Sequence, residues 1–490
     1  MATAAVVGSG PNGLSAAAVL ARAGVAVTVY EARPTAGGGA ASANLLAEDA
    51  VTDTCSAVHP FGIASPVFRA LGLEQRGLEW VHPDLPLAHP LDGLPAATLS
   101  RSVSQTARDL GEDRVRYSRL MRPVVSSWPK LVPEVMGPAL HIPRAPLALA
   151  NFGLRGAWPT TTFARTVFAG ERARALFAGV ASHAVLPLSR PLTSAFGVLF
   201  SAAGHAAGWP VARGGSQAIT DALVADIEAH GGSVITNRPI RALSELEGHD
   251  LVMLDIAPRQ LVALAGDALP AGYTRRLRRY RHGMAAYKVD YLLDGPIPWR
   301  DPECARAGTI HIGGTLDEIA AAEADAAAGR TPDKPFVLLA QQSRFDSSRA
   351  PAGREVVWAY AHVPHGSPIA MGEHIDRQIE RFAPGFRDRI VGRIEESPTD
   401  FEKRNPNYVG GDVWGGSLGG LQLVFRPTIS ADPYATPLPG VYMCSASTPP
   451  GGGVHGMCGY RAAESALKRL GWQERIQPLV APVLDDAVVA

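Results

Sequence analysis

Cysteine and lysine are both scarce in this chain. Its 490 residues include four cysteines, Cys55, Cys304, Cys444 and Cys458. They are widely spaced and form no Cys-x-x-Cys motif, so the sequence predicts neither a zinc site nor a disulfide framework, and it fits a reducing compartment. Five of the 46 Lys and Arg residues are lysines, and this scarcity makes each lysine more informative.

The sequence also lacks an excess of charge of either sign and a long hydrophobic run. Lys and Arg together number 46, as do Asp and Glu, so the net charge is zero and the electrostatic footprint of a nucleic-acid binder is missing. The most apolar stretch, residues 194–209, is shorter than the ~20 residues that cross a bilayer, and glycines interrupt it. We expect no membrane span, while peripheral contact with a membrane stays open.

The beginning of the sequence runs directly into a buried-strand pattern. It has no charged segment and no cleavage site, so we expect no secretory signal and a cytoplasmic location. A length of 490 residues exceeds the size at which a single core keeps growing, which predicts two interleaved domains.

Residues 4–31 have the pattern of a strand, a glycine turn, a helix and a second strand. The turn reads G-S-G-P-N-G, with Gly8, Gly10 and Gly13 at the spacing that lets a pyrophosphate approach the backbone at a helix N-terminus. Glu31 ends the second strand, where it would accept hydrogen bonds from a ribose and disfavour a 2′-phosphate. The pattern predicts a dinucleotide site, and at this step both NAD and FAD fit it.

Three further features favour FAD. The loop lies near the start of the sequence, a second glycine cluster at 37–39 follows Glu31, and a strand, glycine loop and helix occupy 440–471. Several distant segments that converge on one ligand suit a long, extended dinucleotide.

The rest of the chain separates into three kinds of segment. We predict a mainly helical region over 66–209 and a second α/β segment over 214–255. Residues 283–300 and 334–364 alternate in the manner of an antiparallel sheet.

Five stretches carry a family resemblance: GSGPNGLSAA, YEARPTAGGGAAS, GGSQAITDAL, NPNYVGGDVWGG and YMCSASTPPGGGVHGMCGYRAA. Through them the chain resembles the phytoene desaturase-like (phytoene dehydrogenase-related) flavoproteins, within the wider amine oxidase-like group. The resemblance implies an α/β fold in which a Rossmann-type, glutathione-reductase-like FAD-binding domain is interleaved with a substrate domain of antiparallel sheet and helices. The expected FAD-binding domain comprises 1–65, 210–280 and 430–475, and the expected substrate domain comprises 66–209 and 281–429, with a largely helical cap over 105–205.

The resemblance also implies which residues hold FAD. They are Gly8, Gly10, Pro11, Asn12, Gly13, Glu31, Ala32, Arg33, Gly38, Gly39, Ala40, Ile240, Ser445, Ala446, Ser447, Gly453, Val454 and Gly456. The chain departs from the family at Gly39, where many desaturases have arginine. The stretch after Ile240 is also short, which leaves little room for the usual antiparallel insertion.

Two residues are candidates for catalysis. Lys288 lies in MAAYKVDYLLDGPIPW, which resembles the amine oxidase strand whose lysine holds a water at flavin N5; the alternative is a lysine in an ion pair with Asp290. His455 lies in the last glycine loop and could orient substrate or transfer a proton, or have a structural role. No metal-ligand cluster stands out.

Other residues near these motifs have two interpretations each. For His59, Tyr408, Trp414 and Phe425 the alternatives are a cavity wall and the core, and the core is favoured. For Cys444 and Cys458 we favour buried inert thiols over redox partners.

We therefore expect an FAD-dependent oxidoreductase that transfers a hydride to flavin N5 from an apolar substrate, such as a polyene, an isoprenoid or a lipid-like compound. The alternatives are an amine-oxidase-like flavin oxidase that uses O₂, a redox-neutral flavin isomerase, and a non-catalytic flavin-bound interaction protein. Neither the electron acceptor nor the oligomeric state follows from the sequence.

Overall fold

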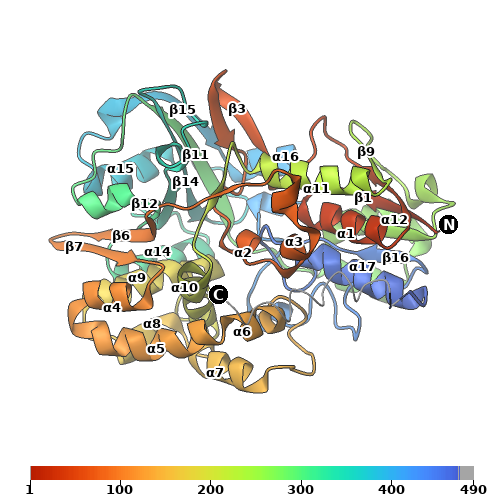
Figure 1. Cartoon of the computed structure of the whole chain (residues 1–490), viewed down its shortest axis with the longest axis horizontal. Coiled ribbons are helices and arrows are strands. Elements are labelled where there is room, and N and C mark those ends of the chain that lie inside the picture. Colours follow the sequence, from red (N-terminus) through yellow and green to blue (C-terminus); the bar gives the residue numbers. More distant parts are fainter. Residues whose placement is uncertain (1, 473, 475–490) are drawn as a thin grey trace.

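The computed structural model describes residues 2–472 and 474. Two sheets organise them: a five-stranded sheet on the right of Figure 1 and a seven-stranded sheet on its upper left, with a group of helices below the latter. The predicted FAD-binding segment 430–475 therefore ends just outside the described residues.

The five-stranded sheet is entirely parallel. Its order is β16 (Val441–Met443), β10 (Leu251–Leu254), β1 (Thr3–Val7), β2 (Ala26–Tyr30) and β9 (Ser233–Ile235). Ala4 and Val6 point into one core, and Ala5 and Val7 point into another, since successive side chains of a strand alternate. The first core includes the helices α1 (Pro11–Arg22), α11 (Gln217–Ala229) and α17 (Met457–Arg469), and the second includes α12 (Pro258–Ala265) and α13 (Ala271–Arg278).

Covering helices on both faces explain why the central strands β1 and β10 read as continuous apolar runs. The predicted strand–helix–strand unit over 4–31 is confirmed. So is the short link after Ile240: among the described residues between β9 and β10 there is one 3-10 turn, Leu243–Leu246, and no strand. Because the strands are parallel, Gly8, Glu31, Asp255 and Cys444 follow the carboxyl ends of four neighbouring strands at one edge of the sheet.

The seven-stranded sheet is antiparallel except at one pair. Its order is β15 (Ile390–Glu396), β11 (Ala285–Leu293), β14 (Glu355–Val363), β13 (Val337–Ala340), β12 (Ala307–Ile312), β6 (Leu85–Leu91) and β7 (Leu94–Leu99). The predicted strands over 283–300 and 334–364 are thus confirmed, and β12 and β6 form the parallel pair.

Strands β6 and β7 correct the expectation of a mainly helical segment at 66–209. Three prolines, Pro86, Pro90 and Pro95, disguise them because proline normally interrupts a strand. Hydrogen-bonded pairing with β12 on one side, and between the two strands themselves, overrides that local signal.

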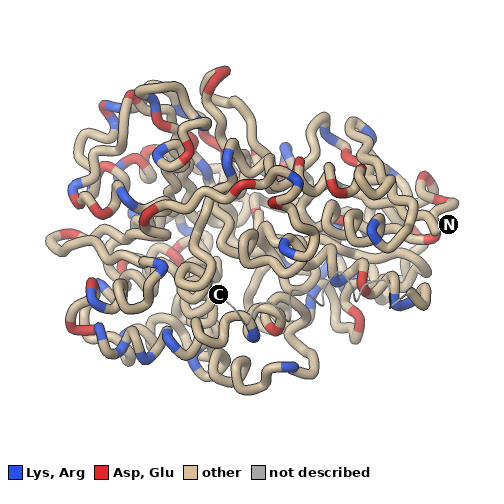
Figure 2. Tube along the Cα trace, viewed as in Figure 1, with Lys and Arg blue, Asp and Glu red and all other residues tan. Residues whose placement is uncertain are grey.

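Seven helices form the layer below this sheet in Figure 1. They are α4 (Val103–Asp109), α5 (Arg114–Ser126), α6 (Trp128–Val135), α7 (Pro146–Gly156), α8 (Thr160–Val167), α9 (Glu171–Ala181) and α10 (Thr193–Ala206). No helix within the described residues has both the length and the apolar character that a membrane span requires. Lys and Arg are interspersed with Asp and Glu over both halves of the molecule (Figure 2).

Two further strand pairs and five further α-helices complete the fold of the described residues. They are the strand pairs β3 (Ser42–Ala47) with β4 (Ala50–Asp53) and β5 (Trp80–Val81) with β8 (Val211–Ala212), and the helices α2 (Pro60–Ile63), α3 (Pro66–Leu71), α14 (Leu316–Ala327), α15 (Gly372–Phe382) and α16 (Pro398–Arg404).

Candidate active site

A cavity of about 760 Å³ lies between the two sheets. Its nucleotide half is the part lined by the carboxyl-end loops of the five-stranded sheet. Its substrate half is the part lined by the seven-stranded sheet and the helical layer. The chain thus joins segments that are hundreds of residues apart around one space.

Most of the predicted FAD-binding residues line this cavity. They are Gly8, Gly10, Pro11, Asn12, Glu31, Ala32, Arg33, Gly38, Gly39, Ile240, Ser445, Ala446, Ser447, Gly453 and Val454. Gly13, Ala40 and Gly456 are not part of the wall. Gly13 lies in the first turn of α1, and Gly456 immediately precedes α17.

The first glycine loop is packed so closely that side chains would not fit. Gly8 has a φ of +96°, which favours glycine. A Cβ on Gly10 would lie 2.6 Å from Asp255 Oδ2, and a Cβ on Gly38 would lie 2.9 Å from Gly10 Cα. The spacing of these glycines therefore has a steric reason in the folded chain.

Glu31 is buried and holds the loop through three hydrogen bonds. Its carboxylate accepts from the Ser9 amide at 3.0 Å, the Ser9 hydroxyl at 2.5 Å and the Arg33 amide at 2.9 Å. These bonds fix the carboxylate at the cavity wall, where the sequence predicts a ribose contact.

Asp255 is a second buried carboxyl group at this loop, and the sequence analysis missed it. It accepts the Gly13 amide at 3.0 Å and lines the cavity. Burial raises the pKa of Asp255 to about 7, and the nearby charge of Glu31 also raises it. The signal that could have found it is its position directly after an apolar strand of the parallel sheet.

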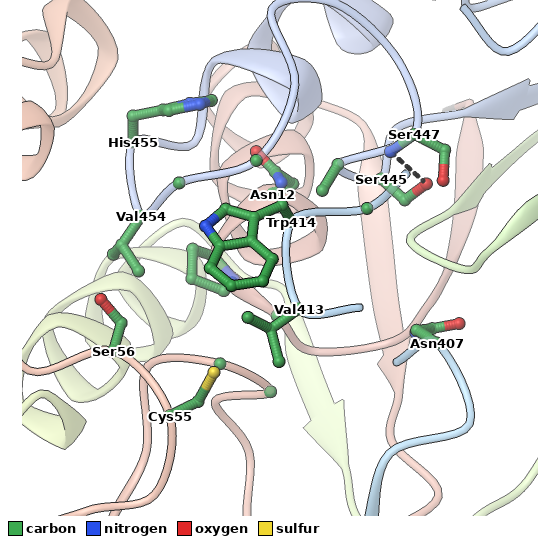
Figure 3. A pocket seen from close by; sticks show the side chains of 18 of the residues that line it. Asn12, Cys55, Ser56, Asn407, Val413, Trp414, Ser445, Ser447, Val454 and His455 are labelled. Carbon is green, nitrogen blue, oxygen red and sulfur yellow. Dashed lines mark hydrogen bonds between the residues drawn. The ribbon is translucent and has the colours of Figure 1, made fainter. Parts of the chain in front are cut away.

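The loop at 444–456 between β16 and α17, here called the C-terminal loop, closes the other side of the nucleotide half (Figure 3). Its Ser447 amide donates to the Ser445 hydroxyl, and a Cβ on Gly452 would lie 2.4 Å from the Trp414 carbonyl oxygen. His455 Nδ1 accepts the Met457 amide at 3.0 Å, and burial lowers the pKa of His455 to about 4. This geometry favours the structural interpretation of His455, in which the ring braces the start of α17.

Arg426 is the second residue that the sequence analysis missed. It is completely buried, and its Nη2 donates to the Tyr280 hydroxyl and the Gly415 carbonyl, both at 2.8 Å. Its Nε and Nη1 have no partner, and none of the described acidic residues forms an ion pair with it. A Cβ on Gly451 would lie 2.7 Å from Nη1, so an unpaired positive charge lies directly against the glycine loop.

Lys288 lies in the middle of β11, is 1% exposed, and lines the cavity. Its ammonium group forms an ion pair with Asp290 and lies 3.6 Å from Glu396. Burial raises the pKa of Asp290 to about 6, although Lys288 opposes that shift. Lys288 is therefore both the ion-pair lysine and a cavity residue.

The remaining candidates divide between wall and core. His59, Tyr408 and Trp414 line the cavity, and Phe425 does not. His59 is bonded to the Ser216 hydroxyl at 2.8 Å, and burial lowers its pKa to about 4. Cys444 and Cys458 are buried free thiols whose pKa values burial raises, which favours the inert interpretation.

The nucleotide half suits a dinucleotide with a negatively charged diphosphate. Helix α1 begins at the cavity with Pro11 and Asn12, and helix α17 begins two residues after the cavity-lining His455. Asn12 Oδ1 is buried and unpartnered. Two helix N-termini and the Arg426 charge provide the positive potential that an anionic ligand needs.

Residues 6–71 match the NAD(P)-binding Rossmann-like domain family. The chain carries a Rossmann-like dinucleotide-binding domain. Across 95% of its length it is 26% identical to the rat protein called pyridine nucleotide-disulfide oxidoreductase domain-containing protein 2, of which 93% is covered. A quarter of the chain, 135 aligned residues, is 36% identical to 26% of 4,4'-diapolycopen-4-al dehydrogenase from Metabacillus indicus.

Solved oxidoreductase structures share the fold of nearly the whole chain. A putrescine oxidase variant superimposes with a TM-score of 0.62 at 18% identity, over 96% of this chain and 99% of that one. At this identity the likeness shows the fold alone.

Proposed function

We propose that this protein is an FAD-dependent oxidoreductase of the phytoene desaturase-like type, with a glutathione-reductase-like FAD domain, that takes a hydride from a mainly apolar small molecule. When bound, FAD would accept that hydride at N5. Location in the cytoplasm, contact with a membrane and the oligomeric state stay predictions.

One observation carries the proposal: the cavity is continuous from the dinucleotide loops to the sheet of the second half. Val7, Glu31 and Ile240 line one end, and Leu338 and Tyr360 line the other. NAD and FAD differ in length and in how many segments enclose them. The C-terminal loop, more than 400 residues after Glu31, joins the same wall, which supports the longer FAD.

The residues divide the binding work in this proposal. The backbone of the first loop and the start of α1 would hold the diphosphate, and Glu31 would bind the ribose of the adenosine. Ser445, Ser447 and the loop at 453–455 would hold the ribityl chain and the flavin. The N-terminal end of the α17 dipole, together with Arg426 beside Gly451, would stabilise negative charge on the ring.

Purification provides the test of this proposal. The protein should be yellow, and denaturation should release FAD in near-stoichiometric amount. A colourless preparation that takes up NAD but does not take up added FAD would contradict it.

Lys288 favours a second candidate, an amine-oxidase-like flavin oxidase that uses O₂. Its ammonium lies on the cavity floor, held by Asp290, in a fold that putrescine oxidase shares. In this function Lys288 would hold a water beside the flavin and aid the reaction with oxygen.

For the oxidase candidate, Lys288→Met should slow reoxidation of the reduced enzyme by O₂ at least about tenfold, because the cation beside the reaction is lost. Stopped-flow mixing with aerated buffer measures this rate. The matched control is Lys334→Met, since Lys334 is exposed and contacts Glu318 on the surface. Equal rates in Lys288→Met and wild type would favour a dehydrogenase with another acceptor.

A further inference from the structure

The floor of the substrate half is one face of the seven-stranded sheet. In strand register, Lys288 on β11 lies beside Tyr360 on β14, and Tyr360 lies beside Leu338 on β13. The same row continues to His311 on β12. Neighbouring strands are about 4.8 Å apart, so Lys288 and His311 mark positions about 14 Å apart on this floor.

A group of polar side chains, buried except for the half-buried His183, occupies the His311 end of the row. We call it the histidine cluster: His183, His311, His362 and Glu323. His183 Nε2 lies 3.3 Å from His311 Nε2, and His362 Nδ1 lies 2.8 Å from Glu323 Oε1. Such a cluster needs a reason, because its surroundings are aromatic and aliphatic.

His183 is the member of the cluster that lines the cavity. It lies in the 3-10 turn Ser182–Ala184 after α9, and its ring stacks on Phe200 at 4.5 Å with an interplanar angle of 14°. The stacking partner and Trp209 also line the cavity, so the imidazole is fixed in an apolar wall. His311, His362 and Glu323 lie behind it and are at most 2% exposed.

A metal ion does not explain the cluster. No group of three or more His, Cys, Asp or Glu residues is arranged to hold one within the part of the chain that the structure describes. Burial lowers the pKa of His183 to about 3 and that of His311 well below its usual value, so both rings are neutral near pH 7. A neutral ring does not select a carboxylate or a phosphate by charge.

The contact between the two rings assigns their protons. One ring must donate across the Nε2 pair, and His311 Nδ1 is buried with no partner. A buried N–H without a partner is rarer than an unpaired acceptor. We therefore assign the shared proton to His311 Nε2, which leaves His183 with its proton on Nδ1.

We propose that His183 binds a neutral oxygen of the substrate, a hydroxyl or a carbonyl, at the inner end of the cavity. The substrate is then an apolar molecule that carries at least one oxygen, and not a pure hydrocarbon. Pockets orient apolar ligands through a few well-placed polar groups, and an unpaired donor penalises a ligand that lacks the matching oxygen. This inference rests on the proposed function, in which the reacting end of the substrate lies near Lys288 and the oxygen-bearing end lies at His183.

The test compares perillyl alcohol with limonene, which differ by one hydroxyl. Calorimetry measures the dissociation constant of each compound, and the FAD content of every preparation is measured separately. Wild type should bind the alcohol about tenfold more tightly than the hydrocarbon.

Three variants separate the hydrogen bond from the shape of the wall. His183→Phe keeps an aromatic ring on Phe200 and removes the donor. It should therefore weaken the binding of perillyl alcohol about tenfold and leave the affinity for limonene unchanged. His183→Asn places an amide N–H near the position of Nδ1 and should retain most of the selectivity. Phe196→Leu, at another cavity-lining position, should change both affinities alike.

Equal affinity of wild type for the two compounds, no binding of either, or unchanged selectivity in His183→Phe would overturn the assignment. Loss of FAD alone does not decide it, because calorimetry detects ligand binding without turnover. A protein that selects the alcohol and binds no FAD would support His183 and refute the proposed function.

Discussion

The nucleotide half of the cavity is built mainly from backbone, whereas the substrate half is built from side chains. In the first, the closest approaches are between glycines and main-chain atoms, as at Gly38 and Gly10. In the second, Lys288, Leu338 and Tyr360 extend from strands of one sheet, and His183 faces them from a helical turn. We therefore expect ligand binding in the nucleotide half to be sensitive to substitutions that add volume. In the substrate half it should be sensitive to substitutions that change polarity.

The two halves of the cavity also give different information about function: one bears on the cofactor and the other on the substrate. A wall of backbone amides and helix ends binds the common part of many dinucleotides. A wall of side chains from different strands can change one residue at a time, so we expect the choice of substrate to be set here.

The largest expected effect is on stability and comes from Asp255. This residue is an exception in the nucleotide half, because it contributes a buried side chain where most of the wall is backbone. Burial raises its pKa to about 7 from the ordinary value of 3.8, so between about pH 4 and 7 the native state holds a proton that the unfolded state has lost. The free energy of unfolding of the apoprotein should fall as pH rises through this window, by up to about 4 kcal/mol, and then level off.

Asp255→Asn should remove most of this pH dependence. Urea denaturation at pH 5 and pH 8 measures the effect, and the exposed Asp49→Asn serves as control because it should leave the dependence as in wild type. Parallel pH profiles for Asp255→Asn and wild type would show that another group is responsible.

The second prediction tests whether the glycine loop of the nucleotide half leaves no room for an added side chain. A Cβ on Gly13 would lie 2.2 Å from the Gly8 carbonyl oxygen, and neither main chain can move aside easily. Gly13→Ala should cost about 1–3 kcal/mol, which corresponds to roughly 10- to 100-fold weaker FAD binding if the loop absorbs the strain.

Fluorescence titration of the apoprotein with FAD measures that affinity. Gly272→Ala in α13 is the control, because a Cβ there meets no atom within 4 Å. If the two alanine variants bind FAD equally well, the close packing of the loop is not what holds the cofactor.

The smallest effect concerns Arg426, a side chain that serves the nucleotide half by charge. Arg426→Met removes the unpaired positive charge against the glycine loop, so the reduced flavin should lose stabilisation. The midpoint potential of bound FAD should become more negative by ~30 mV, equivalent to about 1.4 kcal/mol for a two-electron couple.

Arg426→Lys is the control, since it keeps the charge and should move the potential less. Removing a buried charge that has no acidic partner should leave the stability of the apoprotein unchanged or higher. A potential that does not differ between the methionine variant and wild type would place Arg426 outside the electrostatics of the flavin.

The difference between the halves also explains what the sequence could predict. The loop at Gly8–Gly13 and the carboxylate of Glu31 follow from spacing within 30 residues, and the structure places them together at the sheet edge. Strands β6 and β7 could not be predicted, because their prolines conceal a pairing that only β12, two hundred residues later, provides.

The histidine cluster had no local signal either. His311 and His362 each look like one polar residue in an apolar strand, and His183 like one polar residue in a helical patch. Their meeting depends on the order of strands β14, β13 and β12 in the sheet. Lys288 could be predicted in part. Its strand was recognisable from the sequence, and its ion pair with Asp290 was one of the two alternatives for its role.

The contact between the first and last helices of the described chain has a consequence for how the protein acquires its cofactor. Gly459 of α17 packs so tightly on α1 that a Cβ would come within 1.8 Å of the Asn12 carbonyl oxygen. About 410 residues separate Glu31 from β16, and a ribosome that adds about 5–20 residues per second needs roughly 20–80 s to make them. In the proposed function the binding site can close only after β16 and α17 have been made, so loading of the cofactor would be one of the last steps of maturation.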